Sequence, residues 1–449
     1  MSNDLLTKYD VPVPRYTSYP AVPCWEPESL SLADWEINVR NAFASQGKQG
    51  ISLYIHLPYC EKLCTYCGCN KKVTRNHAVE QPYVHSIIKE WKIYRSLTNE
   101  RPLLKELHLG GGTPTFFSAH NLAELVQPIL EDCEISPEAE FSVEIHPVGT
   151  NHNQLKTLAE LGFKRISIGV QDFDPDVQYL INRIQSFEIT KEVMELSYAS
   201  GFTEINLDLI YGLPGQTVET IAKTARLVIQ LHPARISFYA YAHVPWKSPG
   251  QRLYSDSEIP AGEEKRRLYE TARAILEAGG YRDIGMDHFA LPEDSLFKAR
   301  EAGTLHRNFM GYTPLTTQLL IGLGASAISD TGTAYFQNTK EIEEWKTSVN
   351  AGQLSKCTGH KLTPLDQEIR ERIVGIMCNG KAILPEASKE LDSVLFLLSD
   401  LIEDGLVCVD ENQIVVTEAG RPFLRNIAAC FDPRLIDRVN TIPRFSRAI

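Results

Sequence analysis

The sequence predicts an α/β protein organised around a parallel sheet. Between residues 50 and 245, six short apolar segments alternate with helical patterns, and this alternation favours parallel strands joined by crossover helices. Residues suited to chemistry follow the ends of these segments, which is where the functional loops of a βα barrel lie. The strand count by itself leaves an open barrel and a flat doubly wound sheet as alternatives.

The composition describes a large and acidic protein. Its 449 residues can bury an extensive core and form more than one structural unit. It carries 45 Lys and Arg against 57 Asp and Glu, a formal net charge of -12, which argues against a nucleic-acid partner and against binding to anionic membranes. No apolar run reaches the ~20 residues of a spanning helix, and no signal peptide is visible. We therefore expect a cytoplasmic protein.

The first 30 residues are predicted to form an extended arm. They are rich in proline and aromatic residues, as in Val13–Pro20, and proline disfavours helices and central strands. The arm either lies on the surface or covers a substrate, for which Arg15, Tyr16 and Tyr19 offer a fork-shaped donor and aromatic faces. A helical pattern follows over residues 30–46.

The central part then alternates between strand and helix. The predicted strands are Ile51–Leu57, Glu106–Leu109, Glu140–Ile145, Arg165–Val170, Glu204–Ile210 and Arg235–Tyr239. The helical patterns between them are Val84–Ser96, Leu122–Leu130, Leu155–Leu161, Lys191–Ala199 and Val218–Gln230. A loop over residues 246–260 leads to a further helix, Glu263–Ala278, and Gly322–Ala327 is predicted to be a small-residue turn.

The chain changes character after about residue 360. Two helical patterns, Leu365–Cys378 and Leu391–Glu403, precede two short strands, Leu406–Val409 and Gln413–Val416, and a last helix is expected to open near Thr417. Helices followed by a hairpin resemble a small winged-helix module. Because no helix here is densely basic, a lid or packing role is expected instead of DNA binding.

A cysteine loop follows the first predicted strand. Cys60, Cys64 and Cys67 have the spacing C-x3-C-x2-C, and Cys69 comes two residues later. Thiolates on one tight loop suit an iron–sulfur cluster, and three ligands would leave one of four irons free. Structural zinc, a disulfide framework and inert buried cysteines are the alternatives. The spacing favours the cluster.

Two further strand ends carry candidate residues. Gly110–Pro114 follows the second strand, and consecutive glycines let backbone approach a ligand closely. Asp208 interrupts the apolar fifth strand, where a buried carboxylate needs a partner such as a cation or ligand hydroxyls.

These motifs together resemble the radical S-adenosylmethionine (SAM) superfamily. Cys69, the Arg15–Pro20 segment and the stretches Gly285–Ala290 and Leu305–Thr313 resemble one branch of it, the oxygen-independent coproporphyrinogen III oxidases. The resemblance runs over nearly the whole chain. It implies a partial (β/α)6 barrel with an N-terminal arm and a C-terminal helical, winged-helix-like domain. The expected parts are the arm and its helix (1–46), the barrel (47–245), an extension that closes the active site (246–355) and the C-terminal domain (356–449).

The resemblance also implies the chemistry. In that family three cysteines hold a 4Fe–4S cluster, SAM chelates the fourth iron, and reductive cleavage yields a 5′-deoxyadenosyl radical. The radical takes a hydrogen from a propionate of coproporphyrinogen III, and loss of CO2 and an electron gives a vinyl group. Two such steps give protoporphyrinogen IX in anaerobic haem biosynthesis. Two SAM molecules, a flavodoxin or ferredoxin as electron donor and a monomeric protein are expected.

Residue roles follow from the resemblance alone. The expected cluster ligands are Cys60, Cys64 and Cys67. Catalytic roles are expected for Tyr54, Arg15 and Tyr16. The expected SAM-binding residues are Tyr66, Gly111, Gly112, Thr113, Glu144, Gln171, Arg183, Asp208, Ala242 and Met310.

The chain departs from the family pattern in three places. His146 and Val148 stand where the family usually has Asp and Arg, and Met310 replaces a Gln near the second SAM. Two other interpretations therefore stay open. One is a related haem-binding chaperone, which usually lacks the fourth cysteine and the arm. The other is a different radical SAM enzyme acting on a tetrapyrrole, as in haem-ring opening.

Overall fold

The computed structural model describes residues 3–246, 248–386, 388–436 and 445. Its main feature is a twelve-stranded sheet with the order β16-β15-β14-β13-β1-β4-β5-β6-β7-β8-β10-β9. The six predicted strands are all present, as β1 (Ile51–Leu57), β4 (Leu103–Gly111), β5 (Glu134–Ile145), β6 (Arg165–Gln171), β7 (Glu204–Tyr211) and β8 (Arg235–Ala240).

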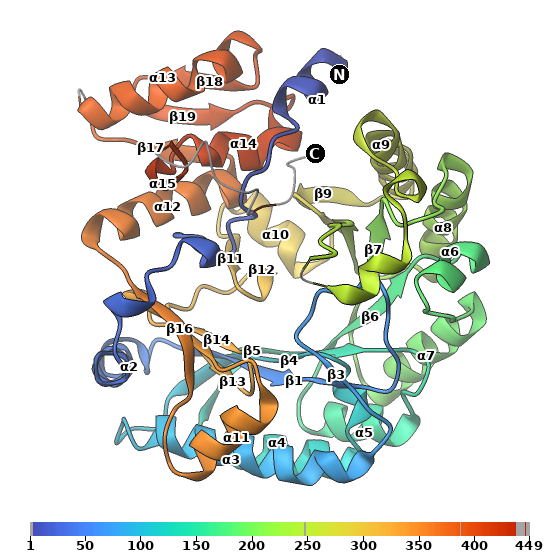
Figure 1. Ribbon diagram of the computed structural model, residues 1–449, viewed down its shortest axis with the longest axis vertical. Helices are drawn as coiled ribbons and strands as arrows, with labels where there is room; N and C mark the ends of the chain where they lie inside the picture. Colours follow the sequence, from blue (N-terminus) through green and yellow to red (C-terminus); the bar gives the residue numbers. More distant parts are fainter. Residues whose placement is uncertain (1–2, 247, 387, 437–444, 446–449) are drawn as a thin grey trace.

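The order of these six strands decides between the two predicted architectures. They are neighbours in chain order, and every pair among them is parallel. A doubly wound sheet reverses its order at a switch point, whereas a barrel adds each strand to the same side. The connecting helices form an outer arc around the strands (Figure 1). The sheet is therefore a partial barrel.

The barrel has one more parallel strand than predicted. β13 (Leu319–Leu323) pairs in parallel with β1, on the side opposite β4. Gly322, predicted to be in a turn, lies inside this strand, and the turn begins at Gly324. Antiparallel strands extend both edges: β14 (Ile328–Asp330), β15 (Ala334–Asn338) and β16 (Lys356–Lys361) on one, β10 (His288–Ala290) and β9 (Arg282–Gly285) on the other.

Helices cover the outer face of the sheet. They are α2 (Leu32–Gln46), α3 (Glu80–Arg95), α4 (Ala119–Glu131), α5 (His152–Glu160), α6 (Pro175–Leu180), α7 (Phe187–Ser200), α8 (Val218–Leu231), α9 (Gly262–Ala278) and α11 (Ile342–Asn350). Several begin at a polar cap, as where the Ser118 and Thr217 side chains accept the backbone N–H three residues on. Among the residues with described structure, no helix is long and apolar enough to cross a membrane.

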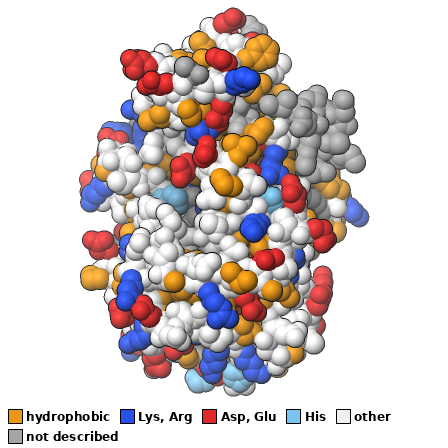
Figure 2. Space-filling view, turned by 90° about the vertical axis from the view of Figure 1, so that its left-hand side faces the viewer, with side chains coloured by type: hydrophobic (Ala, Val, Ile, Leu, Met, Phe, Trp, Pro, Cys, Tyr) orange, Lys and Arg blue, Asp and Glu red, His pale blue; other side chains and the backbone are white. Residues whose placement is uncertain are grey.

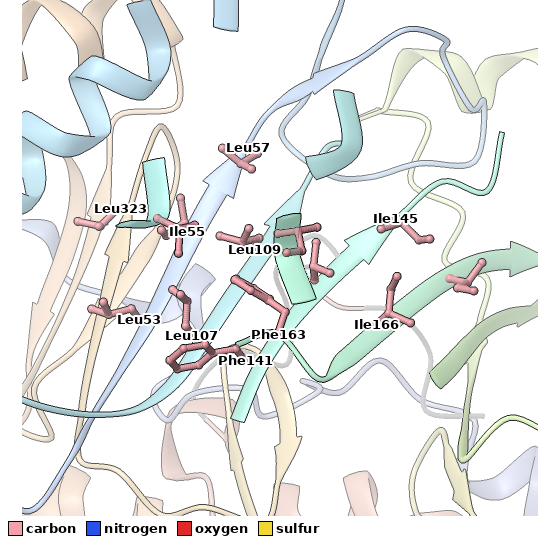
Figure 3. Packing of buried hydrophobic residues seen from close by; sticks show 14 of the residues in the cluster. Leu53, Ile55, Leu57, Leu107, Leu109, Phe141, Ile145, Phe163, Ile166 and Leu323 are labelled. Atoms are coloured by element: carbon pink, nitrogen blue, oxygen red, sulfur yellow. The ribbon is translucent and has the colours of Figure 1, made fainter. Parts of the chain in front are cut away.

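Each barrel strand has one apolar and one polar face. Along β1, Leu53, Ile55 and Leu57 are fully buried in the main hydrophobic cluster, beside Leu107 and Leu109 of β4 (Figure 3). The residues between them point to the opposite face, because side chains alternate along a strand. The apolar face packs against the helices, and the polar face encloses the barrel interior.

The N-terminal arm is buried, which corrects the expectation of a surface segment. It starts with a helix, α1 (Asn3–Tyr9), because the proline-rich stretch begins only after Asp10. Tyr9, Tyr16 and Tyr19 then pack into a hydrophobic cluster formed mainly by residues 369–431. The arm runs along the C-terminal domain (Figure 1).

The remaining elements form the extension and the C-terminal domain. The extension adds α10 (Ser295–Glu301), β11 (His306–Asn308) and β12 (Gly311–Thr313). The C-terminal domain contains α12 (Pro364–Asn379), β17 (Lys381–Ile383), α13 (Lys389–Glu403), β18 (Val407–Asp410), β19 (Gln413–Val416), α14 (Leu424–Ala429) and α15 (Pro433–Ile436).

The C-terminal domain matches a winged helix more fully than predicted. The hairpin β18–β19 has a third strand, β17, on its free side. The helix expected near Thr417 starts only at Leu424, as α14, after a turn and a short 3-10 helix (Arg421–Phe423). The end of the predicted domain, residues 437–444 and 446–449, lies outside the described residues. On the face in Figure 2, acidic and basic side chains are interspersed.

Candidate active site

A cavity of about 660 Å³ lies inside the curve of the barrel. Its wall includes the polar faces of β4 to β8 and the loops at their carboxyl ends. Of the predicted site residues, these line it: Arg15, Cys60, Cys64, Tyr66, Cys67, Gly111, Gly112, Thr113, Glu144, Gln171, Arg183, Asp208, Ala242 and Met310. Tyr16 and Tyr54 are absent from the lining. Side chains from distant parts of the chain thus meet at one place.

The cysteine loop forms one end of the cavity. Cys60, Cys64 and Cys67 are partly exposed and are free thiols, and all three face the same space. The Thr113 hydroxyl donates to the Cys60 sulfur over 3.4 Å, and the Arg183 guanidinium donates to the Cys64 sulfur over 3.5 Å. Donors beside sulfur stabilise the thiolate form that binds iron.

The electrostatics of the thiols differ. Burial raises the pKa of Cys60 to about 11. The neighbouring thiol of Cys69 and the Lys71 ammonium lower the pKa of Cys67 to about 6, against the effect of burial.

In the described ranges, no group of three or more His, Cys, Asp or Glu is spaced to hold a single metal ion. Cysteines of a 4Fe–4S cluster bind separate irons, and three thiols facing one cavity fit that group.

Contacts from two neighbouring loops hold the cysteine loop in place. The Thr65 N–H donates to the carbonyl of Ile181 over 3.1 Å, and the Asn182 amide donates to the carbonyl of Leu63 over 2.7 Å. From the other side, the buried Gln251 amide donates to the carbonyl of Tyr66 over 2.8 Å. The loops after β6 and β8 therefore fix where the thiols point.

The glycine loop after β4 needs its glycines. Gly111 has a φ of +109°, and a Cβ there would lie 2.5 Å from the His56 ring. A Cβ on Gly112 would lie 2.6 Å from the backbone of Pro58. The Gly111 N–H donates to Glu144 Oε2 over 3.1 Å. The glycines bring backbone donors close to a carboxylate at the cavity wall.

Two carboxylates face the cavity with opposite pKa shifts. Although burial favours the neutral acid, donors from His108 and Gly111 keep the pKa of Glu144 below its usual range. Burial, with repulsion from Glu144, raises the pKa of Asp208 to about 6. Its partners are the Ser167 hydroxyl and the Asn206 amide, both at 2.8 Å. The partner expected for Asp208 is thus supplied by the barrel itself.

The remaining predicted residues come from other loops. Gln171 ends β6 with a φ of +70° and lines the cavity. Arg183 is buried, and its guanidinium donates to the carbonyl of Gly169 over 2.5 Å. Met310 lies in the turn between β11 and β12, where its N–H donates to the Asn308 side chain. The departures His146 and Val148 also line the cavity.

The three residues predicted to be catalytic are placed differently. Arg15 lines the cavity, and its guanidinium pairs with Asp287 over 2.6 Å. The Tyr54 hydroxyl is hydrogen bonded to His56 Nδ1 over 2.9 Å. The Tyr54 ring does not line the cavity itself but stacks on His108, which does. Tyr16 packs into the C-terminal domain, with its hydroxyl on Asp432 at 3.1 Å. The structure does not bring Tyr16 to the site.

A row of polar side chains inside the barrel was not predicted. Ordinary barrel interiors are filled with branched apolar residues, but here the inward positions carry His108, Ser142, Ser167, Asn206 and Ser237. Their alternation with apolar residues in each strand was the available signal. The amino ends of the strands add the ion pairs Arg165–Glu140 and Arg235–Glu204, of which Arg165, Glu140 and Arg235 also line the cavity.

Similarity to known proteins covers nearly the whole chain. Residues 54–228 match the Radical SAM superfamily. The chain is 38% identical over 455 residues to the oxygen-independent coproporphyrinogen III oxidase of Escherichia coli, covering 99% of this chain and 98% of that protein. It is 37% identical over 456 residues to the protein of that name from Pseudomonas aeruginosa, with the same coverage.

A solved structure gives the same result for the fold. The coproporphyrinogen III oxidase of Escherichia coli, described as a radical SAM enzyme, aligns with a TM-score of 0.89. The sequence identity is 37%, and the alignment covers 94% of this chain and 97% of that one. With its cysteine loop and glycine loop at one cavity of a partial barrel, the chain belongs to the family of oxygen-independent coproporphyrinogen III oxidases, within the radical SAM superfamily.

Proposed function

We propose that the protein oxidatively decarboxylates two propionates of coproporphyrinogen III to vinyl groups, giving protoporphyrinogen IX in anaerobic haem biosynthesis. Family membership supports the reaction. The observation that carries the proposal is the meeting of three free thiols, a glycine loop and two carboxylates at the carboxyl ends of the barrel strands, around one cavity. A volume of about 660 Å³ is within the usual range for sites of small molecules and cofactors.

The proposed roles divide the cavity into two parts. Cys60, Cys64 and Cys67 would hold a 4Fe–4S cluster, which supplies the electron that cleaves SAM. The amino group of SAM would lie at the glycine loop, where Glu144 stays ionised and can accept hydrogen bonds from a cation. Arg183 is already oriented by the carbonyl of Gly169 and suits a carboxylate.

The polar interior would receive the tetrapyrrole. Substrate propionates need cationic donors, and Arg15 offers one at the cavity wall. A deoxyadenosyl radical abstracts hydrogen from most C–H bonds, so water and mobile side chains must be kept away from it. The extension (246–355), expected to close the active site, and Arg15 of the arm, which lines the cavity, would serve that role.

Several finer points belong to the same proposal. A second SAM is expected near Met310, whose thioether cannot replace the hydrogen bonds of an amide. Lys71, just after the cysteine loop, lines the cavity and can reach the ligand, whereas the neighbouring Lys72 is exposed. We further propose a cytoplasmic monomer that takes electrons from a flavodoxin or a ferredoxin.

Anaerobic turnover tests the proposal. The reconstituted protein, with SAM and a chemical reductant, should convert coproporphyrinogen III and release two CO2 for each protoporphyrinogen formed. Product masses would distinguish a different radical SAM reaction on the tetrapyrrole. Tight haem binding without turnover would instead assign the chain to the haem-binding chaperones and overturn the proposal.

A further inference from the structure

Among the residues that the structure describes, one buried arginine next to the cavity has no ion-pair partner. Arg307, in β11, is 8% exposed. Neither its Nε nor its Nη1 has a hydrogen-bond acceptor among the residues that the structure describes, and within those ranges no carboxylate lies within 4.0 Å of it. The guanidinium lies over the Tyr312 ring, 4.7 Å from its centre. In the described part of the chain, an aromatic ring face takes the place of a carboxylate beside this guanidinium.

Two arginines at the amino ends of the barrel strands, the buried Arg235 and the partly buried Arg165, are matched by carboxylates. Arg235 pairs with Asp294 over 2.6 Å and with Glu204 over 3.0 Å. Arg165 pairs with Glu140 over 2.6 Å and with Glu204 over 2.9 Å. Burying an ion without a partner destabilises the folded protein by several kcal/mol, because the charge loses its contact with water. Within the described ranges, Arg183 also lacks a carboxylate partner but donates to the carbonyl of Gly169 and the sulfur of Cys64, whereas Arg307 lacks a counter-charge and has acceptors for neither Nε nor Nη1.

A second unmatched group stands beside it on the cavity wall. His288 lines the cavity, and its Nδ1 is buried with no hydrogen-bond partner in the described part of the chain. Its ring meets the edges of Tyr239 and Tyr312 at 5.7 and 5.3 Å between centres. Burial, then the positive charge of Arg307, lowers the pKa of His288 to about 3, so the ring is neutral and can present an N–H donor.

The surroundings connect both groups to the cavity. Asn308 precedes Met310 by two residues and lines the cavity, as do Tyr312 and His288. Arg307 is paired across the β11–β12 ladder with Tyr312 and stands directly behind this wall. Arg15 and Arg235 add positive potential at His288. Carboxylates match the charges of Arg15 (Asp287) and of Arg235 (Asp294 and Glu204), so among the described residues Arg307 is the unmatched positive charge beside His288.

We propose that His288 and Arg307 form a binding site for a carboxylate of the bound ligand. The carboxylate would accept the Nδ1–H of His288 at the wall and supply the missing counter-charge of Arg307 behind it. This inference rests on the proposed function, which offers two sources of that group: a propionate of the tetrapyrrole or the amino-acid end of a SAM molecule.

Binding measurements on Arg307→Met and Arg307→Lys test the site. Fluorescence quenching with coproporphyrin III, the stable oxidised form, reports the tetrapyrrole, and equilibrium dialysis reports SAM. Truncating one partner of a desolvated charge pair costs enough to weaken binding about 30-fold. We expect this loss for coproporphyrin III in Arg307→Met, a partial recovery in Arg307→Lys, and unchanged binding in the exposed control Arg40→Met.

Thermal unfolding supplies the structural control. Removing an unmatched buried charge should leave the melting temperature of the ligand-free protein unchanged or raise it. Weaker SAM binding with normal coproporphyrin binding would assign the carboxylate to SAM and keep the site. Unchanged binding of both ligands, or a lower melting temperature with loss of both, would overturn it. If wild-type protein binds coproporphyrin III without turnover, the proposed function fails and the site stands.

Discussion

At the scale of single residues, the fourth cysteine raises the sharpest question. Cys69 is exposed and lies two residues from Cys67, to which its thiol is hydrogen bonded. It could therefore serve as a ligand or only as a neighbour of one. The Thr113 hydroxyl and the Arg183 guanidinium reach Cys60 and Cys64 instead.

Serine substitutions separate these roles. Changing Cys60, Cys64 or Cys67 should abolish the visible absorption of the cluster and all cleavage of SAM, because each removes one of three ligands. Cys69→Ser should keep both. Iron content and absorbance of the reconstituted variants provide the measurement. Loss of iron in Cys69→Ser as complete as in Cys64→Ser would show that the ligand assignment is wrong.

Met310 is a second residue whose role can be measured directly. It lines the cavity where an amide is expected in the family. Met310→Gln restores two donors and an acceptor, so it should tighten the weaker of two SAM sites by about tenfold, the effect of a hydrogen bond to a charged group. Equilibrium dialysis should count two SAM per cluster. A single site that ignores the substitution would refute two-SAM binding in this protein.

Asp208 should reduce the stability of the ligand-free protein at neutral pH. Its folded-state pKa of about 6 exceeds the ordinary 3.8. The folded state therefore binds the proton more tightly, and stability falls as pH rises from about 4 through 6. Each pKa unit corresponds to about 1.4 kcal/mol. Asp208→Asn should raise the melting temperature at pH 8, and the gain should shrink towards pH 4. A gain independent of pH would exclude this explanation.

At the scale of elements, the six strands were predictable because each is a short apolar run bounded by turn residues. β13 was missed because Gly322 and Gly324 made its end look like a turn, although Leu319–Leu323 is buried throughout. β13 lies in the sheet because it pairs with β1, and a single sequence does not indicate which distant segments pair. Pairing with distant segments overrides local propensity.

The residues of the site also divide into those that a local sequence pattern predicts and those that only distant contacts reveal. The cysteine and glycine loops were predictable because their spacing is local. Gln251, which holds the cysteine loop, and Arg307 gave no local signal, since their importance comes from segments distant in the chain. The placement of Tyr16 failed for a related reason: its contacts are with residues near 432, which composition alone does not indicate.

The arm offers a prediction at this scale. Deleting residues 1–20 removes Tyr9, Tyr16 and Tyr19 from the cluster of the C-terminal domain, so the melting temperature should fall by several degrees. Tyr16→Phe keeps the packing and loses a single hydrogen bond, which costs about 1 kcal/mol. Both values come from thermal unfolding.

Turnover of the same arm variants separates packing from substrate handling. Arg15→Gln should lower CO2 release per 5′-deoxyadenosine formed, because Arg15 is the arm residue at the cavity. Tyr16→Phe should leave that ratio unchanged. A normal ratio in Arg15→Gln would restrict the whole arm to packing.

At the scale of the whole molecule, the cavity wall combines residues from the arm, the barrel and the extension. Arg15 comes from the arm, Cys60 from the barrel, and Met310 and Tyr312 from the extension. The Tyr312 hydroxyl donates to the carbonyl of Met377 over 2.8 Å, so the wall also contacts the C-terminal domain. Changes in that domain can therefore reach the site through β12.

The pairing of β1 with β13 has a consequence for synthesis of the chain. Residues 51–55 leave the ribosome more than 260 positions before residues 319–323, their partners on one side. The tyrosines of the arm are synthesised earlier still, and the residues that bury them, 369–431, are synthesised near the end of the chain. Until then the growing chain exposes an unpaired strand edge and aromatic side chains, the features that promote aggregation of folding intermediates. This topology therefore leaves the nascent protein open to aggregation until its C-terminal domain has been translated.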